Sequence, residues 1–317
     1  MEFSELFLKD PQVETTKLKL DFEPNFEVSL FVKREDRIHP FISGNKFRKL
    51  KYNFLEAKEK GFQQLLTFGG AYSNHISAVA SLGHEFGFET IGIIRGEELG
   101  KDIESTLLSN PTLQFAREKG MKLAFVTREQ YRDKEKDYFT HRLRQNYGDF
   151  FLIPEGGTND LAIKGCEEIL QEEDRQFDFV CVAVGTGGTL SGLINSSASH
   201  QRILGFPALK GDFLKSEIEK YTIRKEGWSL INDYHFGGYG KVNEDLVNFI
   251  NKFSHEQHIP LDPVYTGKMF FGIFDLIKKG YFFKGAKILA IHTGGLQGIK
   301  GMNLRFKRKN IPLRIYE

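Results

Sequence analysis

The sequence predicts an α/β protein, because short apolar runs alternate with segments of helical periodicity along most of its 317 residues. The run 179–184 is the most apolar and has the length of a buried strand. The segment 45–60 places its apolar residues at the spacing of one helix face. Repeated strand–helix–strand units form parallel sheets with helices on both faces, so we expect ligands at the carboxyl ends of the strands.

In the first half of the chain, expected strands and helices follow one another closely. The helix over 45–60 has an apolar stripe that includes Phe47, Leu50 and Phe54, and Gly61 stands where a helix normally ends. We expect strands at 29–33, 65–68, 90–95, 122–126 and 151–154, helices at 45–60, 73–85 and 107–119, and a solvated helix in the polar stretch 128–145.

The second half continues this pattern. Thr158 is a favourable N-cap for a helix over 159–173. No linker rich in Pro, Gly or Ser interrupts the alternation, so the pattern alone does not divide the chain into domains. The remaining expected elements are strands at 179–184, 202–206 and 288–292 and helices at 190–197, 244–256 and 267–279.

Composition and charge argue against several classes of protein. The chain has 44 basic and 42 acidic residues, and a net charge of +2 gives no electrostatic footprint for nucleic acid or an anionic membrane. No apolar run approaches the roughly 20 residues that span a bilayer. Residues 1–5 lack the pattern of a secretory signal, and the two cysteines, Cys166 and Cys181, are expected to be reduced. We therefore expect a cytoplasmic protein with no nucleic-acid or membrane partner.

A glycine-rich turn follows the most apolar strand. It comprises Gly185, Thr186, Gly187, Gly188 and Thr189 and leads into a helix, so free backbone N–H groups and the helix dipole favour a phosphate group there. The turn lacks the ending of a P-loop. It is also a poor dinucleotide fingerprint, because Leu190 occupies the sixth position and no acidic residue ends the following strand. The alternative is a tight turn without a ligand.

A second candidate is a lysine near the start of the helix expected at 45–60. Lys46 follows Ser43, Gly44 and Asn45 at the start of the helix over 45–60. Most lysines are solvated surface cations, but the dipole at a helix start disfavours a positive charge. A lysine tolerated there has a lowered pKa, which suits an amine nucleophile.

Other turns add polar groups at strand ends. Ser73 could simply cap a helix, but Asn74 and His75 follow it directly, and Thr293 comes after another apolar strand. Tyr265 opens a further helix, although a lone tyrosine is usually packing. A lysine, a phosphate-binding turn and several hydroxyl groups at strand ends are what pyridoxal 5′-phosphate requires of a protein.

Five motifs, taken in order, carry a family resemblance. The chain resembles the 1-aminocyclopropane-1-carboxylate (ACC) deaminase/D-cysteine desulfhydrase family, a branch of the tryptophan-synthase-β-like (fold type II) pyridoxal-phosphate enzymes. The resemblance extends from about residue 30 to residue 298. The motifs that carry it lie at 44–50, 69–75, 185–189, 261–268 and 292–295.

The resemblance implies a role for each of these positions. Lys46 matches the Schiff-base lysine, Asn74 the partner of the cofactor's phenolic oxygen, and 185–189 the phosphate loop. Thr293 matches the hydroxyl that faces the pyridine nitrogen in the desulfhydrase branch. The catalytic residues implied are Lys46, Ser73, Tyr265 and Tyr239, and the residues implied to bind substrate are Ser73, Asn74, His75, Tyr239 and Tyr265.

The resemblance also implies the architecture. The family fold consists of two open three-layer α/β/α domains with twisted, mostly parallel sheets and the cofactor in the cleft between them. Residues 47–151 would form the small domain, and residues 1–46 and 152–317 the large one. We expect a homodimer that acts on a small amino acid and holds no metal.

Four departures bear on the substrate. Thr266 stands where ACC deaminases have glutamate, and His75 stands where they have glutamine, so both favour the desulfhydrase branch. Tyr72 replaces a glutamine that both branches usually carry, and the region 190–238 looks short. We expect a lyase or deaminase that forms a 2-oxo acid and ammonia, with D-cysteine favoured over ACC. The alternatives from other classes are a nicotinamide-dependent oxidoreductase and a non-catalytic ligand-binding protein on the same scaffold.

Overall fold

The computed structural model describes residues 7, 11–20, 27–312 and 314–316. Residues 1–5, on which the expected absence of a secretory signal rests, lie outside this part of the chain. Within it, no helix has both the length and the apolar character to cross a membrane.

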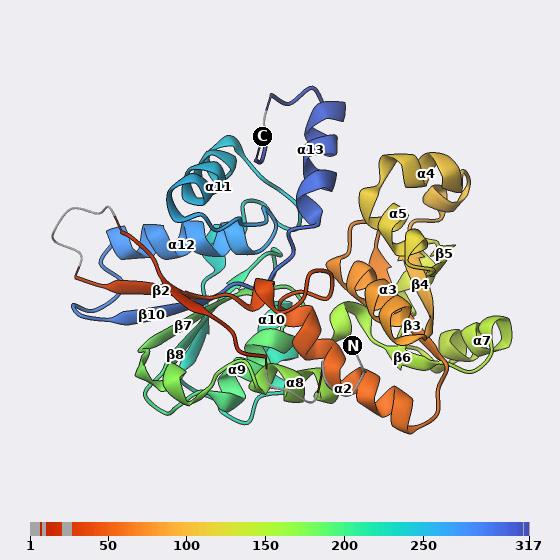
Figure 1. Cartoon of the computed structure of the whole chain (residues 1–317), viewed down its shortest axis with the longest axis horizontal. Helices are drawn as coiled ribbons and strands as arrows, with labels where there is room; N and C mark the ends of the chain where they lie inside the picture. The colour runs from red at the N-terminus through yellow and green to blue at the C-terminus, as the bar shows by residue number, and fades with distance from the viewer. Residues whose placement is uncertain (1–6, 8–10, 21–26, 313, 317) are drawn as a thin grey trace.

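Two sheets form two lobes, and the α/β class predicted from the sequence is confirmed (Figure 1). The larger sheet has the order β1-β2-β10-β7-β8-β9, and its neighbours are parallel except for the pair β1–β2. The smaller sheet has the order β5-β4-β3-β6 and is parallel throughout. The larger sheet comprises β1 (Thr15–Lys17), β2 (Ser29–Lys33), β7 (Phe179–Val184), β8 (Arg202–Pro207), β9 (Trp228–Leu230) and β10 (Lys287–Ile291), and the smaller one β3 (Gln64–Gly70), β4 (Glu89–Arg95), β5 (Lys122–Val126) and β6 (Phe151–Ile153).

Helices cover both faces of each sheet, so both lobes have three layers. One face of the larger sheet packs on α11 (Glu244–Gln257), α12 (Thr266–Lys278) and α13 (Gly298–Arg308), and the other on α8 (Asp160–Glu167), α9 (Gly188–Ser196) and α10 (Phe213–Glu219). The smaller sheet lies between α2 (Asn45–Glu59), α3 (Asn74–Phe86), α4 (Ile103–Ser109) and α5 (Pro111–Glu118) on one side and α6 (Arg128–Arg132) and α7 (Asp137–Tyr147) on the other.

Some expected elements need correction. The helix expected at 107–119 is two helices, because Asn110 caps α5 and Pro111 begins it. The stretch 128–145 is not fully solvated, since Phe139 and Leu143 of α7 pack beneath the smaller sheet. The helix expected at 159–173 ends at Glu167. The structure also contains β1, β9, α10 and α13, which are not among the expected elements.

Helix α2 lies between the two lobes (Figure 1). Its apolar side, which includes Phe47 and Phe54, belongs to the core of the small lobe. Its other side meets α8 closely, because a Cβ at Gly165 would lie 2.0 Å from the carbonyl oxygen of Arg48. Helix α2 contributes to the core of the small lobe and also packs on α8, and the expected division at residues 47 and 151 stays a prediction.

Helix α13 is a second link between the lobes. The ring of Tyr72, at the end of β3, packs on Gly301, where a Cβ would lie 2.9 Å from Tyr72 Cδ1. Arg308 donates a hydrogen bond to the carbonyl oxygen of Ser109 over 2.9 Å. Tyr72 therefore lies against α13, and it is not among the residues that line the cavity described below.

Candidate active site

A cavity of about 200 Å³ lies where the strand ends of both sheets meet the start of α2. It brings together nearly all the site residues that the sequence predicts, although they are spread over 250 positions of the chain. Those that line it are Lys46, Ser73, Asn74, His75, Gly185, Thr186, Gly187, Thr189, Tyr239, Tyr265 and Thr293. Gly188 is the exception, and it is the buried first residue of α9.

The start of α2 is pressed against the end of β10. Gly44 has φ +61°, and a Cβ there would lie 2.0 Å from the carbonyl oxygen of Thr293. Only glycine fits both the backbone angle and the close approach. Asn45 N donates to the same carbonyl over 3.4 Å, and Asn45 Nδ2 donates to Thr189 Oγ1 over 2.8 Å. These contacts bring the first turn of α2 to the glycine-rich turn.

Two lysine amines share the cavity. Lys46 Nζ donates to the carbonyl oxygen of Gly156 over 3.2 Å, and Lys49 Nζ donates to the same atom over 3.1 Å. Burial and, next, the charge of Lys49 hold the pKa of Lys46 well below its ordinary value. Burial lowers the pKa of Lys49 to about 8. An amine with a lowered pKa suits a nucleophile or a base. The causes here are burial and the neighbouring Lys49, whereas the expectation from the sequence relied on the dipole at the helix start.

Lys49 lies at the glycine-rich turn and was missed from the sequence. Its amine donates to Thr158 Oγ1 over 2.9 Å and to Thr186 Oγ1 over 3.3 Å, and a Cβ at Gly188 would lie 3.0 Å from Nζ. The sequence does contain a signal for Lys49. It lies three residues after the candidate Lys46, and residues i and i+3 share one face of a helix. A cation beside a helix N-terminus and two hydroxyl groups fits a phosphate group.

The turn before α3 supplies a cap and two cavity residues. Ser73 Oγ accepts a hydrogen bond from Ile76 N over 3.4 Å, so the expected capping role and a place at the cavity hold together. His75 lies 2.8 Å from Thr67 through its Nε2. Burial, followed by the charges of Lys46 and Lys49, keeps the pKa of His75 well below its ordinary value, so the ring is neutral.

Tyrosines 239 and 265 form one wall of the cavity, with ring centroids 6.1 Å apart in an edge-to-face arrangement. Burial raises the pKa of Tyr265 well above its ordinary value, so its hydroxyl remains protonated. The loop that carries Tyr239 is held from two helices. Lys268 Nζ donates to the carbonyl oxygens of His235 and Gly238 over 2.8 and 2.9 Å, and Arg305 donates to that of Gly240 over 2.8 Å.

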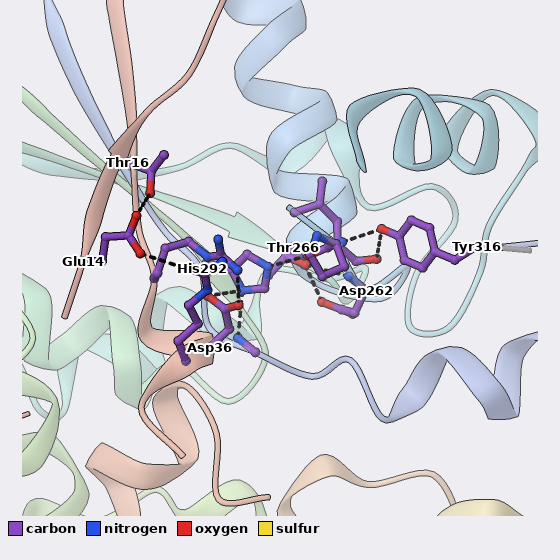
Figure 2. A network of polar contacts seen from close by, with 12 residues as sticks. Glu14, Thr16, Asp36, Asp262, Thr266, His292 and Tyr316 are labelled. Atoms are coloured by element: carbon purple, nitrogen blue, oxygen red, sulfur yellow. Dashed lines mark hydrogen bonds and ion pairs between the residues drawn. The ribbon is translucent and has the colours of Figure 1, made fainter. Parts of the chain in front are cut away.

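A buried carboxylate orders the loop that carries Tyr265 (Figure 2). Asp262 accepts hydrogen bonds from the backbone N–H groups of 264–266, each over 2.8 Å, and from Thr266 Oγ1 over 2.7 Å. Tyr316 donates to the carbonyl oxygen of Leu261, and His292 contacts that of Pro260. The loop is therefore tied to both the end of β10 and the C-terminal segment.

Thr266 and Thr293 have different surroundings. The Thr266 side chain is fully buried, its hydroxyl is committed to Asp262, and it is not among the residues that line the cavity. Thr293 does line the cavity. Thr266 was expected to favour the desulfhydrase branch over ACC deaminase. That expectation rests on its position in the sequence alone, since its hydroxyl is hydrogen-bonded to Asp262.

Two charged residues at the cavity were also missed. Arg95 ends β4 and Glu155 follows β6, and both side chains line the cavity. Both stand at carboxyl ends of parallel strands, which is the signal that could have drawn attention to them. Among the described residues that line the cavity, Glu155 is the acidic one.

Comparisons with known proteins agree on the family to which this chain is similar. Residues 10–294 match the family model described as pyridoxal-phosphate dependent enzyme. A Pyrococcus horikoshii protein named "Putative 1-aminocyclopropane-1-carboxylate deaminase" is 30% identical over 317 residues, which cover 92% of this chain and 94% of the relative. The mitochondrial bifunctional D-cysteine desulfhydrase/1-aminocyclopropane-1-carboxylate deaminase of Arabidopsis thaliana is 30% identical over 294 residues, 85% of this chain and 73% of that protein.

A solved structure agrees with these relatives. The crystal structure of an ACC deaminase homologue superposes with a TM-score of 0.76 at 28% identity, and the match covers 96% of this chain and 97% of the other. The two-lobed arrangement is therefore shared with that protein.

The surroundings of Thr266 predict the result of placing a glutamate there. Thr266→Glu should lower the free energy of unfolding by roughly 3 kcal/mol or more, because it buries a second carboxylate beside Asp262. Chemical denaturation measures the loss, and Thr266→Ser, which keeps the hydroxyl, should stay close to wild type. A Thr266→Glu protein as stable as wild type would contradict this description of the site.

Proposed function

Because this chain belongs to the pyridoxal-phosphate-dependent enzymes, in the ACC deaminase/D-cysteine desulfhydrase family, its cofactor is pyridoxal 5′-phosphate, and we propose that it converts a small amino acid to a 2-oxo acid and ammonia. The observation that carries the proposal is the meeting of Lys46, the glycine-rich turn and Thr293 in one cavity. We further propose elimination from D-cysteine or a related amino acid as the favoured reaction.

The residues of the cavity fit the cofactor. The turn 185–189, the start of α9 and the Lys49 amine would hold its phosphate. Asn74 would contact its phenolic oxygen and Thr293 its ring nitrogen, and both lie in the cavity wall. The bound cofactor supplies an electron-withdrawing ring that stabilises negative charge at the substrate Cα.

The proton transfers fall to residues of the chain. Lys46 would hold the cofactor, and its amine would take the Cα proton of the substrate. Its lowered pKa keeps the amine neutral and therefore able to accept that proton. Ser73 and the N–H groups at the start of α3 would orient the substrate carboxylate. Tyr265, which stays protonated, would donate to the departing group.

The choice between the two branches depends on the partner of the ring nitrogen. A threonine hydroxyl cannot keep that nitrogen protonated as a carboxylate would, so the ring withdraws electrons less strongly. Loss of a Cα proton together with a good leaving group, such as a thiolate, needs less electron withdrawal than opening the carbon ring of ACC. ACC deamination is the second candidate, and the names of the relatives favour it.

A non-catalytic ligand-binding protein is the alternative from another class. A protein that only binds its ligand has no need of a buried neutral amine. The lowered pKa of Lys46 therefore favours catalysis over binding alone.

The position of Lys46 can be tested by chemical labelling. Borohydride reduction of the enzyme should fix the cofactor on the peptide that contains Lys46, and mass mapping should place the added group on its Nζ. Lys46→Ala should lower kcat by about 10³-fold or more, because the base is lost with the attachment point. A label on Lys49 would overturn the assignment.

The substrate preference predicts a ranking of kcat/KM. D-cysteine or a related small amino acid should give measurable ammonia and 2-oxo acid, and ACC little or none. Steady-state assays with D-cysteine, L-cysteine, D-serine and ACC decide the question. A higher kcat/KM for ACC than for D-cysteine would show that the argument from Thr293 is wrong.

The Lys49 amine predicts a pH dependence of phosphate binding. Lys49 with a pKa of about 8 is charged below that pH and neutral above it, so affinity for a dianionic phosphate should fall as pH rises through 8. Titration with 4-deoxypyridoxine 5′-phosphate, which lacks the aldehyde, isolates this effect from the bond to Lys46. Lys49→Gln should bind more weakly and lose the fall, while the exposed control Lys58→Gln should keep it. An unchanged pH profile in Lys49→Gln would exclude Lys49.

A further inference from the structure

The side chain of His292 links two segments that line the cavity (Figure 2). This residue lies between the end of β10 and Thr293, and it is fully buried. Its Nε2 lies 2.7 Å from the carbonyl oxygen of Pro260, in the segment that leads to Tyr265. Its Nδ1 accepts a hydrogen bond from Gly294 N over 3.2 Å. One imidazole therefore contacts both the turn after β10 and the loop before α12.

The neighbours of His292 assign its hydrogen to Nε2. The Gly294 N–H group can only donate, so Nδ1 is the acceptor, and the Pro260 carbonyl can only accept, so Nε2 is the donor. Asp36 Oδ1 lies 3.5 Å from Nδ1, but Arg34 donates to both oxygens of that carboxylate over 2.8 and 2.7 Å. Each ring nitrogen of His292 thus has its own partner, and the two partners belong to different segments.

The bond at Nδ1 shapes the turn that carries Thr293. A side-chain acceptor that bonds the N–H group two residues later closes a turn of the kind that Asn and Asp make. The turn includes Gly294, which has φ +76°. The Thr293 carbonyl oxygen in this turn accepts from Asn45 N and lies against Gly44. The Nδ1 bond therefore acts on Thr293 and on the start of α2.

The bond at Nε2 acts on the opposite wall of the cavity. Pro260 lies two residues before Asp262, whose carboxylate accepts a hydrogen bond from Tyr265 N over 2.8 Å. The carbonyl oxygen that follows Pro260 accepts from the Tyr316 hydroxyl over 2.9 Å. His292 and Tyr316 therefore hold two consecutive carbonyl groups of the loop that carries Tyr265.

We propose that His292 is a positioning residue that holds the two sides of the site separately, Thr293 through Nδ1 and Tyr265 through Nε2. The first role concerns the cofactor alone, because Thr293 is the candidate partner of its ring nitrogen. The second role rests on the proposed function, in which Tyr265 donates a proton to the departing group. The two roles predict different defects when one nitrogen is replaced at a time.

Two substitutions separate the ring nitrogens. The amide oxygen of asparagine falls near the place of Nδ1, and the amide nitrogen of glutamine falls near that of Nε2. His292→Asn therefore keeps the bond to Gly294, and His292→Gln keeps the bond to Pro260. Each variant loses one hydrogen bond, so a general loss of stability affects both alike. His255→Gln, at an exposed histidine of α11, is the matched control and should match wild type.

Cofactor affinity tests the role of Nδ1. On dilution, the His292→Gln holoenzyme should release pyridoxal 5′-phosphate with a Kd about 10-fold above that of wild type. The Kd of His292→Asn should stay within about 3-fold of wild type. Equal Kd values in the two variants, or weaker binding by His292→Asn, would overturn the role of Nδ1.

The leaving group of the substrate tests the role of Nε2. Hydroxide leaves D-serine only with a proton, whereas D-cysteine releases a thiolate that needs none. At saturating cofactor, His292→Asn should therefore lower kcat for D-serine about 10-fold more than kcat for D-cysteine. His292→Gln should change both by the same factor. The same selectivity in both variants, or in neither, would contradict the role of Nε2.

Amide exchange tests both roles without turnover. Hydrogen–deuterium exchange of the holoenzyme should be about 10-fold faster at the amides of 264–266 in His292→Asn, and at that of Gly294 in His292→Gln. If no amino acid is turned over but this crossed pattern is found, the proposed function fails and the positioning role of His292 stands. Faster exchange at both places in both variants, or at neither place, would overturn the proposal.

Discussion

The close contact between the start of α2 and the end of β10 is the constraint on which the site depends. A carbonyl oxygen of Thr293 occupies the space that any side chain at residue 44 would need. Helix α2 begins at Asn45, one residue before Lys46, so this contact fixes where the Lys46 amine enters the cavity. The same helix carries Lys49 one turn later, which places a second amine at the glycine-rich turn. The contact at Gly44 thereby helps to position the Lys46 and Lys49 amines relative to the glycine-rich turn.

Much of this arrangement follows from the sequence, because strands and glycine turns have local signals. The strands at 29–33, 122–126 and 179–184 have the expected bounds, since each is an apolar run between clear breaks. The turns after β3, β7 and β10 were found as glycine-rich segments, and the rule for parallel sheets predicts that such turns gather at one edge. The cavity contains the residues that this rule selects.

What the sequence did not give depends on contacts between distant residues. Lys49 looks like a surface cation in a basic helix start, and only Thr158 and Thr186, more than 100 positions away, show that it faces the cavity. Thr266 looks like a substitute for a catalytic acid until Asp262 is seen to hold its hydroxyl. The place of Tyr72 could not be predicted either, because its ring packs on Gly301 of α13, a helix that the sequence pattern did not predict.

Helix α13 touches two parts of the molecule that lie far from each other in the chain. It carries Gly301 beneath Tyr72 of the small lobe, and one turn further along it carries Arg305, which holds the backbone beside Tyr239. Helix α13 therefore joins the packing of the small lobe to the backbone that carries Tyr239. A substitution that displaces α13 would consequently alter two things together, the contact with Tyr72 and the hydrogen bond that holds Gly240 beside Tyr239.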